Sequence, residues 1–235
     1  MYDYSNHVSW GGRFPMKSNL KCMKDLEIFQ ALNEAEIAQV LQLARGKQYK
    51  KGESIFAEGD PADTIFLVKE GKVLLYKISE DGKELSLDIL RENDIFGENS
   101  ILEDNLQTMH AKALEDAFIC TCTQKDFHSL MINPIVAFKV IIYLSEKLNN
   151  YTQQAAVMAF QDVKGRVLST LSRLAKEYGE LTPEGLKINI TLSHQELANL
   201  VNASRVMVTN VLNELKHEGV IGVNQRIFYL CDLKQ

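Results

Sequence analysis

A single long helical pattern, running from Pro134 to about Phe160, constrains the fold of this chain more than any other feature. Apolar residues recur within it at alternating steps of three and four, which is the a/d pattern of a two-stranded coiled coil. An isolated helix would expose this stripe to water, whereas a second copy of the chain would cover it. We therefore predict a homodimer whose seam consists of Ile141, Leu144, Leu148, Tyr151, Ala155 and Met158. The alternative is a core helix packed within its own domain.

Short strand patterns separated by glycine occupy residues 48–123, before the long helix. They lie at residues 54–60, 64–71, 72–79, 84–90, 107–114 and 117–123. The pair Asp81-Gly82 indicates a type I′ hairpin, because glycine accepts a positive φ. This spacing predicts a closed double-sheet β-roll (jelly roll) with an interior large enough for a small ligand. Ahead of it we expect an amphipathic helix at residues 26–44 and a flexible extension at residues 1–24.

A further helix is predicted after a break at residues 160–162, which has the character of a hinge. Asp162 is a typical N-cap residue, apolar spacing continues from Val163 to Tyr178, and Gly179 ends the helix. Residues 186–192 then have a strand pattern.

The segment that follows has the pattern of a winged helix-turn-helix. The run Ser193-His194-Gln195-Glu196 is a capping box at the start of one short helix. Asn202 suits the left-handed backbone of a tight turn, and Ser204 can cap a second helix that Gly219 ends. Two short strands, residues 220–223 and 226–230, are expected to turn at Asn224-Gln225 and form the wing.

These patterns together predict an α+β protein with a β-roll, a long dimerisation helix and a carboxyl-terminal winged helix-turn-helix. The expected boundaries are 1–24 for the extension, 25–133 for the roll, 134–161 for the long helix and hinge, and 162–235 for the winged helix-turn-helix domain. No apolar run reaches membrane-spanning length, and the amino-terminal stretch lacks the pattern of a signal peptide. We therefore expect a cytoplasmic protein without a membrane partner.

Charge and cysteine content add weaker indications. Residues 163–235 hold nine Lys/Arg and seven Asp/Glu, whereas the rest hold seventeen and twenty-four, which together give the net charge of -5. A weakly basic carboxyl-terminal part is compatible with nucleic-acid contact. The four cysteines are too few and too irregular for a disulfide framework, and Cys120 and Cys122 are expected to be small core residues.

The order of these motifs resembles a known family. The stretch KGESIFAEGDPADTIFLVKEGKVLLYKISEDGKE, followed by DIFGE, resembles the effector domain of the CRP/FNR family of bacterial transcription regulators. The resemblance continues through AFQDVKGRV to SHQELANLVNASRVMVTNVLNELKHEGVI and covers roughly residues 25–232. It implies a homodimer that binds a palindromic site in double-stranded DNA, and RNA polymerase as a further partner if the protein is an activator.

The predicted DNA contacts follow from the helix-turn-helix pattern. Arg205 can make a bidentate contact to guanine, Val206 offers only apolar contact, and Asn210 has the geometry for adenine. Lys216 is expected to contact a phosphate. The half-sites should lie about one helical turn apart, with a guanine kept and the neighbouring pairs shifted towards A·T. The full set of predicted contacts is Ser193, His194, Gln195, Ser204, Arg205, Val206, Thr209, Asn210 and Lys216.

The effector cannot be assigned from the sequence. In the family's cyclic AMP-binding members a Gly-Glu pair and an Arg-Ser pair hold the nucleotide, and here Gly97-Glu98 matches the first pair but Gln107-Thr108 replaces the second. Glutamine cannot replace the charged, bidentate phosphate partner, so cyclic AMP is not the expected effector. The predicted effector pocket consists of Gly97, Glu98, Asn99, Gln107, Thr108, Lys147, Tyr151 and Thr152.

Other branches of the family match only in part. The carbon-monoxide sensing branch has a haem-ligand His where this chain has Asn99, and the iron–sulfur branch has clustered cysteines where Cys22 stands alone. The 2-oxoglutarate-responding nitrogen regulators share the run 205–209, but Lys147 and Thr152 replace their helix Arg and Glu.

No metal site is predicted, and no enzyme signature is found. Haem bound by His110 or His128 stays open, although a single His is more often structural. The competing class of protein is a ligand-binding module that regulates a protein partner without DNA, and a haem or redox sensor of the same family is a further alternative.

Overall fold

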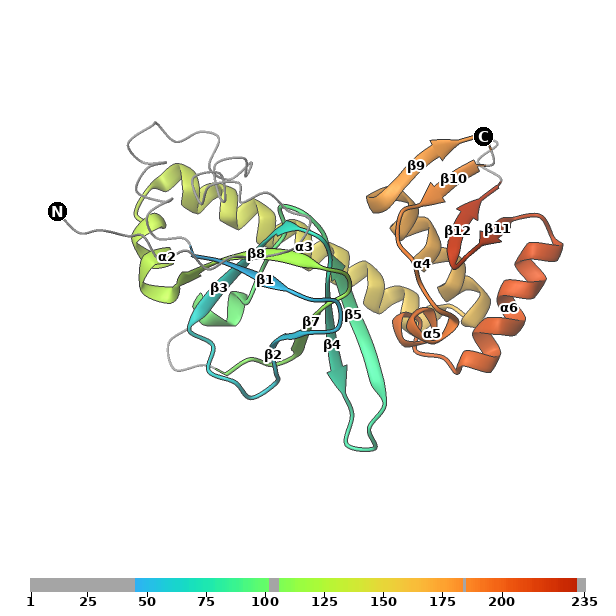
Figure 1. Cartoon of the computed structure of the whole chain (residues 1–235), viewed down its shortest axis with the longest axis horizontal. Coiled ribbons are helices and arrows are strands. Elements are labelled where there is room, and N and C mark those ends of the chain that lie inside the picture. Colours follow the sequence, from blue (N-terminus) through green and yellow to red (C-terminus); the bar gives the residue numbers. More distant parts are fainter. Residues whose placement is uncertain (1–44, 102–105, 184, 232–235) are drawn as a thin grey trace, which may run out of the picture.

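The computed structural model describes residues 45–101, 106–183 and 185–231 (Figure 1). The predicted extension and the predicted helix at residues 26–44 lie outside these ranges. The fold consists of a β-roll, one long helix and a mixed carboxyl-terminal domain, as the sequence predicts.

Two four-stranded sheets form the roll, with strand orders β1-β8-β3-β6 and β2-β7-β4-β5. All their pairings are antiparallel, and Phe56, Phe66 and Phe96 pack between the sheets with ring centroids 5.0 to 6.0 Å apart. Aromatic side chains therefore occupy part of the interior that the sequence suggested for a ligand. The strands are β1 (Arg45–Tyr49), β2 (Ser54–Phe56), β3 (Thr64–Glu70), β4 (Val73–Ile78), β5 (Glu84–Leu90), β6 (Ile95–Phe96), β7 (His110–Ala113) and β8 (Ala117–Thr123).

The hairpin between β4 and β5 lies where Asp81-Gly82 placed it, but its predicted type is wrong. Among the loop residues only Gly82 has a positive φ, of 80°, whereas a type I′ turn needs two. The Gly82 N–H donates to the Ser79 carbonyl, and the Ser79 N–H donates to the Lys83 carbonyl. These bonds define a three-residue loop that ends in a glycine bulge, the next most common hairpin connection.

Two helices follow the roll. The short helix α2 (Gln124–Leu130), capped by Thr123, was not predicted. The long helix α3 (Pro134–Phe160), here called the spine, has the predicted bounds. No single helix in the described ranges is long and apolar enough to cross a membrane, and only α2 and α3 taken together, across a 113° bend, pass that test of length and composition.

The predicted seam of the spine is split between two faces. Leu144 packs against the apolar cluster under α3 in its own roll, and Tyr151 is half-buried beside β5. Ile141 and Leu148, in contrast, are 56% and 68% exposed. One apolar pattern on this helix therefore serves both its own roll and an outer face, and the seam itself stays a prediction. That outer face carries Ile135, Phe138, Ile141, Ile142 and Leu148.

The carboxyl-terminal domain, here called the reader, combines three helices with the sheet β11-β12-β10-β9. Asp162, Ser193 and Ser204 cap its helices as predicted, and Asn202 has the expected positive φ of 48°. Its elements are α4 (Val163–Tyr178), β9 (Gly179–Thr182), β10 (Gly185–Ile188), α5 (His194–Leu200), α6 (Arg205–His217), β11 (Ile221–Asn224) and β12 (Ile227–Leu230). The strand β9 was not predicted.

The wing turn lies one residue later than predicted. Asn224 pairs with Ile227, which leaves Gln225 and Arg226 as the two-residue loop. Both have positive φ, 49° and 67°, as a type I′ turn requires. Arg226 therefore stands at the tip of the wing.

The reader is docked on the β4–β5 face of the roll, and α6 lies on the side away from the roll (Figure 1). Leu74 and Ile89 of the roll belong to the same buried apolar cluster as the core of the reader. The Tyr178 hydroxyl donates to the Ile89 carbonyl, and the Arg91 guanidinium donates to the Glu177 carbonyl. The position of the reader thus depends on this interface as well as on the hinge at Gln161.

The two cysteines of β8 differ in state. Cys122 is a free, buried thiol, as expected for a small core residue. Cys120 is also buried in the apolar core, as expected, but it takes part in a disulfide, which the sequence did not predict.

Candidate nucleic-acid interface and effector site

Some of the predicted effector residues meet where β6 approaches the spine. Lys147 of α3 is only 11% exposed and donates to the Ile95 carbonyl at 3.1 Å. Its ammonium lies 3.6 Å from the Glu98 carboxylate and within 6 Å of the ring centroids of Tyr143 and Tyr151. A buried ammonium held by a carboxylate and two aromatic faces is a strong polar centre.

The remaining predicted effector residues lie in other environments. Asn99 donates to the Thr108 hydroxyl at 2.9 Å, so these two form a pair of their own. Gln107 is buried, and its backbone pairs with Gly59 and Asp60. Thr152 is exposed on the spine and donates to the Leu148 carbonyl.

Gly97 requires its glycine. Its φ is 81°, and a Cβ there would lie 2.8 Å from both the Phe66 ring and the Thr64 carbonyl. It turns the chain from β6 into the 3-10 helix Glu98–Ile101, which brings Glu98 to the spine.

A junction of half-buried charges joins this site to the reader. The Asp88 carboxylate lies 3.4 Å from the Arg173 guanidinium of α4 and 3.5 Å from the Tyr151 hydroxyl of α3. Burial raises the pKa of Asp88 from 3.8 to about 6, and the attraction of Arg173 only partly opposes the shift. Burial and the nearby Asp88 carboxylate also raise the pKa of Tyr151. The junction therefore touches the roll, the spine and the reader at one point.

The two histidines considered as haem ligands both bond to protein groups. His110 accepts the Glu58 N–H at Nδ1, at 3.2 Å, and stacks on Tyr76. His128 lies 3.2 Å from the Ile101 carbonyl. These bonds give each ring a structural role.

The exposed start of α6 carries most of the predicted DNA contacts. Arg205, Val206 and Asn210 are exposed, and Val206 is 69% exposed although it is apolar. Lys164 of α4 bonds to both Glu214 and Glu218, which ties the far end of α6 to the domain. The carboxyl-terminal end of α6 is thus fixed to α4, while the first turn of α6 faces solvent.

Hydrogen bonds between α5 and α6 fix the side chains around this first turn. The Thr209 hydroxyl donates to the Arg205 carbonyl at 2.8 Å, so it can only accept from His194 Nδ1, which lies 2.9 Å away. Ser193 and Ser204 use their hydroxyls as helix caps. Lys216 is exposed three turns after Arg205, on the same side of α6.

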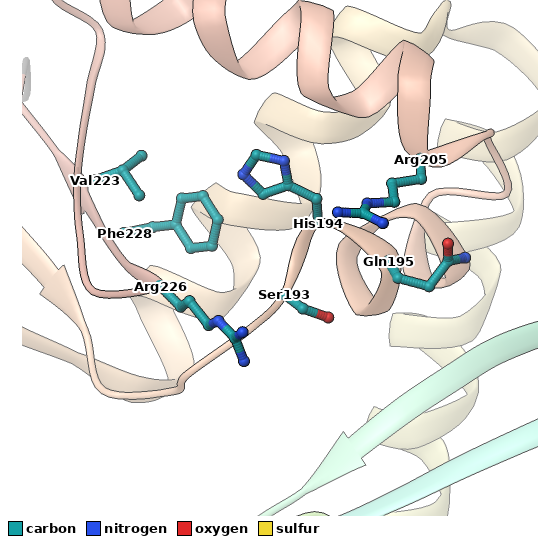
Figure 2. A pocket seen from close by; sticks show the side chains of 7 residues that line it. All are labelled: Ser193, His194, Gln195, Arg205, Val223, Arg226 and Phe228. Atoms are coloured by element: carbon teal, nitrogen blue, oxygen red, sulfur yellow. The ribbon is translucent and has the colours of Figure 1, made fainter.

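A hollow of about 420 Å³ lies between α5, α6 and the wing. Figure 2 shows Arg205 and Arg226 on opposite sides of it, with Ser193 and His194 between them. The described residues that line this hollow include two guanidinium groups and no carboxylate, which makes it suited to an anion such as a DNA phosphate. The lining residues are Ser193, His194, Gln195, Arg205, Val223, Arg226 and Phe228.

Sequence reasoning missed two residues of this surface. Arg226 was assigned to a wing strand, whereas a basic residue next to the turn signal Asn224-Gln225 was the available clue. Met207 is 48% exposed beside Val206, and its apolar spacing gave no reason to separate it from the core of α6.

Comparisons with known proteins agree with this arrangement. Residues 46–133 match the cyclic nucleotide-binding domain, and residues 165–235 match the Crp-like helix-turn-helix domain. The cAMP-activated global transcriptional regulator CRP of Pasteurella multocida is 32% identical over 180 residues, which are 75% of this chain and 85% of that protein. The chain belongs to the CRP/FNR family of transcription regulators.

Other members of the CRP/FNR family are similar to a comparable degree. The global nitrogen regulator of Synechococcus elongatus is 29% identical over 183 residues, 77% of this chain and 82% of that protein. A solved structure of a CooA mutant from Carboxydothermus hydrogenoformans superposes with a TM-score of 0.75 at 28% identity, covering 89% of this chain and 93% of that one. Family membership thus identifies a transcription regulator with a helix-turn-helix and a cyclic nucleotide-binding fold.

Proposed function

We propose that this family member is a homodimer that binds a palindromic DNA site through α6 and responds to a small effector held between roll and spine. The observation that carries the proposal is the exposed first turn of α6, where Arg205 and Val206 stand beside a hollow lined by two arginines. Selection of binding sites from a random DNA pool, followed by fluorescence anisotropy, tests it. A protein that selects no sequence would instead be a module acting on a protein partner.

The site preferred by α6 follows from three side chains. In each half-site Arg205 contacts a guanine, Val206 contacts a thymine methyl and Asn210 contacts an adenine. Half-sites about one helical turn apart follow from the two-fold symmetry of a dimer. Recovery of a G·C-rich core next to the guanine would contradict this assignment. If the protein activates transcription, RNA polymerase is its further partner.

The outer face of the spine supports the dimer. Phe138 is 63% exposed there, and Ile141 and Leu148 continue the apolar stripe. A second spine packed on this face removes the stripe from water. The double change Ile141→Glu and Leu148→Glu should yield monomer in analytical ultracentrifugation with the fold retained by circular dichroism. An unchanged dimer would refute this interface.

A matched control separates dimerisation from folding. Leu144→Glu places a charge in the chain's own apolar cluster, so it should lower the free energy of unfolding at every protein concentration. The outer-face changes should instead lower stability only where the wild type is dimeric.

The effector is proposed to contact Lys147 and to differ from cyclic AMP. Lys147 is the cation of this site, where it bonds to the Ile95 carbonyl and lies beside Glu98. Cyclic AMP is not expected there, because Gln107 lacks the guanidinium that would bind its cyclic phosphate. Relatives named as cAMP-activated exist at 32% identity, so calorimetry with cyclic AMP is the direct test. Micromolar binding that raises DNA affinity would overturn this part of the proposal. Mass spectrometry and an absorption spectrum of the native protein would identify a bound effector or haem.

The charged junction at Asp88 is the proposed route from effector to reader. An effector that displaces Tyr151 or Lys147 changes the surroundings of Asp88 and thus its pairing with Arg173. Such couplings typically amount to about 1 to 3 kcal/mol, about 5- to 150-fold in DNA affinity.

A further inference from the structure

The imidazole of His194 borders the hollow between α5, α6 and the wing, and one of its two nitrogens is already in use. Nδ1 lies 2.9 Å from the Thr209 hydroxyl, which itself donates to the Arg205 carbonyl at 2.8 Å. A hydroxyl has a single hydrogen, so Nδ1 must carry the hydrogen of its bond to Thr209. The other nitrogen, Nε2, therefore has no hydrogen whenever the ring is neutral.

Nε2 lies on the side of the ring that faces the hollow. Figure 2 shows the ring extending from the start of α5 towards Phe228, with the nitrogen next to its stem turned to α6 and the other nitrogen turned to the wing. His194 is half-buried and lines the hollow together with Val223 and Phe228. A ligand in the hollow therefore meets Nε2, because Thr209 covers Nδ1.

The charged groups around the ring favour an anion in the hollow. Arg205 of α6 and Arg226 of the wing are the charged residues among the described ones that line it. The carboxylate nearest to His194 in the sequence of α5 is Glu196, which accepts the Ser193 N–H at 2.7 Å in the capping box. A DNA phosphate drawn in by the two guanidinium groups would thus lie close to Nε2.

The protonation state of the ring decides whether Nε2 attracts or repels this phosphate. A neutral ring presents a lone pair to the phosphate oxygen, whereas the imidazolium presents an N–H and a positive charge. Histidine ordinarily gains or loses this charge between about pH 5 and 8. A phosphate binds the charged form more tightly, so bound DNA and the bound proton stabilise each other.

We propose that His194 couples DNA binding to proton uptake, because with Nδ1 held by Thr209 its Nε2 donates to a DNA phosphate only when the ring is protonated. This inference rests on the proposed function and deepens it, because it adds pH as a second signal that is sensed at the DNA interface itself. DNA affinity should fall as the pH rises and His194 loses its proton. The contact is to a phosphate, so preferred and unrelated DNA sequences should show the same dependence.

Three variants test the coupling by fluorescence anisotropy on the selected DNA site. Wild type should bind about tenfold more weakly at about pH 8 than at about pH 6. His194→Gln should bind equally at both values, as weakly as wild type at about pH 8, and His194→Arg should bind tightly at both. In Thr209→Val the neutral ring is free to carry its hydrogen on Nε2, so the affinity at about pH 8 should approach that at about pH 6.

The controls exclude other groups that titrate over this range. His217→Gln removes an exposed histidine from the last turn of α6 and should keep the tenfold change. Asp88, whose pKa is raised to about 6, is removed by repeating the comparison of wild type and His194→Gln in the Asp88→Asn background. Titration calorimetry in buffers of different ionisation enthalpy should show proton uptake on DNA binding that His194→Gln abolishes.

Several outcomes would overturn the proposal. They are a pH dependence that persists in His194→Gln, one that disappears in His217→Gln, and one that is unchanged in Thr209→Val. A wild type whose DNA affinity is the same at both pH values would also overturn it. A wild type that binds no DNA at any pH would instead remove the proposed function itself, so the two failures are distinguishable.

Discussion

Asp88 allows the energetics of the roll–reader interface to be tested through pH. Its side chain is 15% exposed, and burial raises its pKa from 3.8 to about 6 despite the cation of Arg173. A shift of about 2 pKa units corresponds to about 3 kcal/mol between the two protonation states. The ionised carboxylate is thus held in the interface at a cost of this order.

The sign of the pH dependence follows from the raised pKa. Between pH 3.8 and about 6 the folded protein binds a proton at Asp88 that the unfolded chain has released. The stabilisation from this group is therefore complete below about pH 3.8 and is lost as the pH rises through about 6. The charged and titratable groups that act on Asp88 are Arg173 and Glu177 from α4, Lys147 and Tyr151 from α3, and Asp94 from the roll.

The substitution Asp88→Asn removes this titration without changing the size of the side chain. Arg173 keeps Glu177 as a partner at 3.2 Å, so its charge stays compensated. Urea unfolding should give similar stabilities below about pH 3.8, and the variant should become the more stable protein as the pH rises, by up to about 3 kcal/mol at about pH 8.

The control for this experiment is Asp116→Asn. Hydrogen bonds from Lys50 and Lys51 lower the pKa of this exposed carboxyl, so its removal should not add stability as the pH rises over the same range. Stability profiles of wild type and Asp88→Asn that run parallel over this range would refute the argument. A variant less stable than wild type at the alkaline end would show that the pair with Arg173 outweighs burial.

Three further predictions concern single residues. Arg205→Ala should cost about 1 to 3 kcal/mol of DNA-binding free energy and flatten the preference for guanine, which site selection would show. Lys216→Ala and Arg226→Ala should instead weaken the binding of all DNA sequences alike and reduce its salt dependence, which a salt titration would show. Gly179→Ala should cost about 1 to 3 kcal/mol in urea unfolding, because a Cβ there would lie 2.0 Å from the Ala175 carbonyl oxygen, and an unchanged midpoint would contradict it. Cys122, whose pKa burial raises to about 12, should resist a thiol reagent at about pH 8 in mass spectrometry while the exposed Cys231 reacts.

Local signals in the sequence determined the elements with strong caps and regular spacing. The spine, α4, α5 and α6 begin at Asn133, Asp162, Ser193 and Ser204, whose side chains accept backbone N–H groups. Each of these bonds joins residues only a few positions apart, so the sequence alone indicates it. The strands β1, β6 and β9 were missed because they are short and depend on partners far away in sequence.

Contacts between distant segments could not be predicted. Leu144 and Leu148 are both leucines that fit the same helical repeat. Leu144 nevertheless packs against the roll, whereas Leu148 faces solvent. Arg226 lines the hollow between α5, α6 and the wing from the wing turn, which lies one residue later than expected. The approach of Asp88 to Arg173 joins residues of different domains, and no local pattern reports it.

The apolar cluster shared by Leu74, Ile89 and the core of the reader has a consequence for engineering. A hybrid made by joining another member's sensor to this reader at Gln161 would keep the covalent connection but lose the matching surface on β4 and β5. Its reader would then present uncovered apolar side chains, which favours aggregation over regulation. A working chimera has to carry the reader-facing side of the β4–β5 hairpin along with the reader. The same requirement ties substitutions in α4 and α5 to substitutions in β5 as sensors diversify.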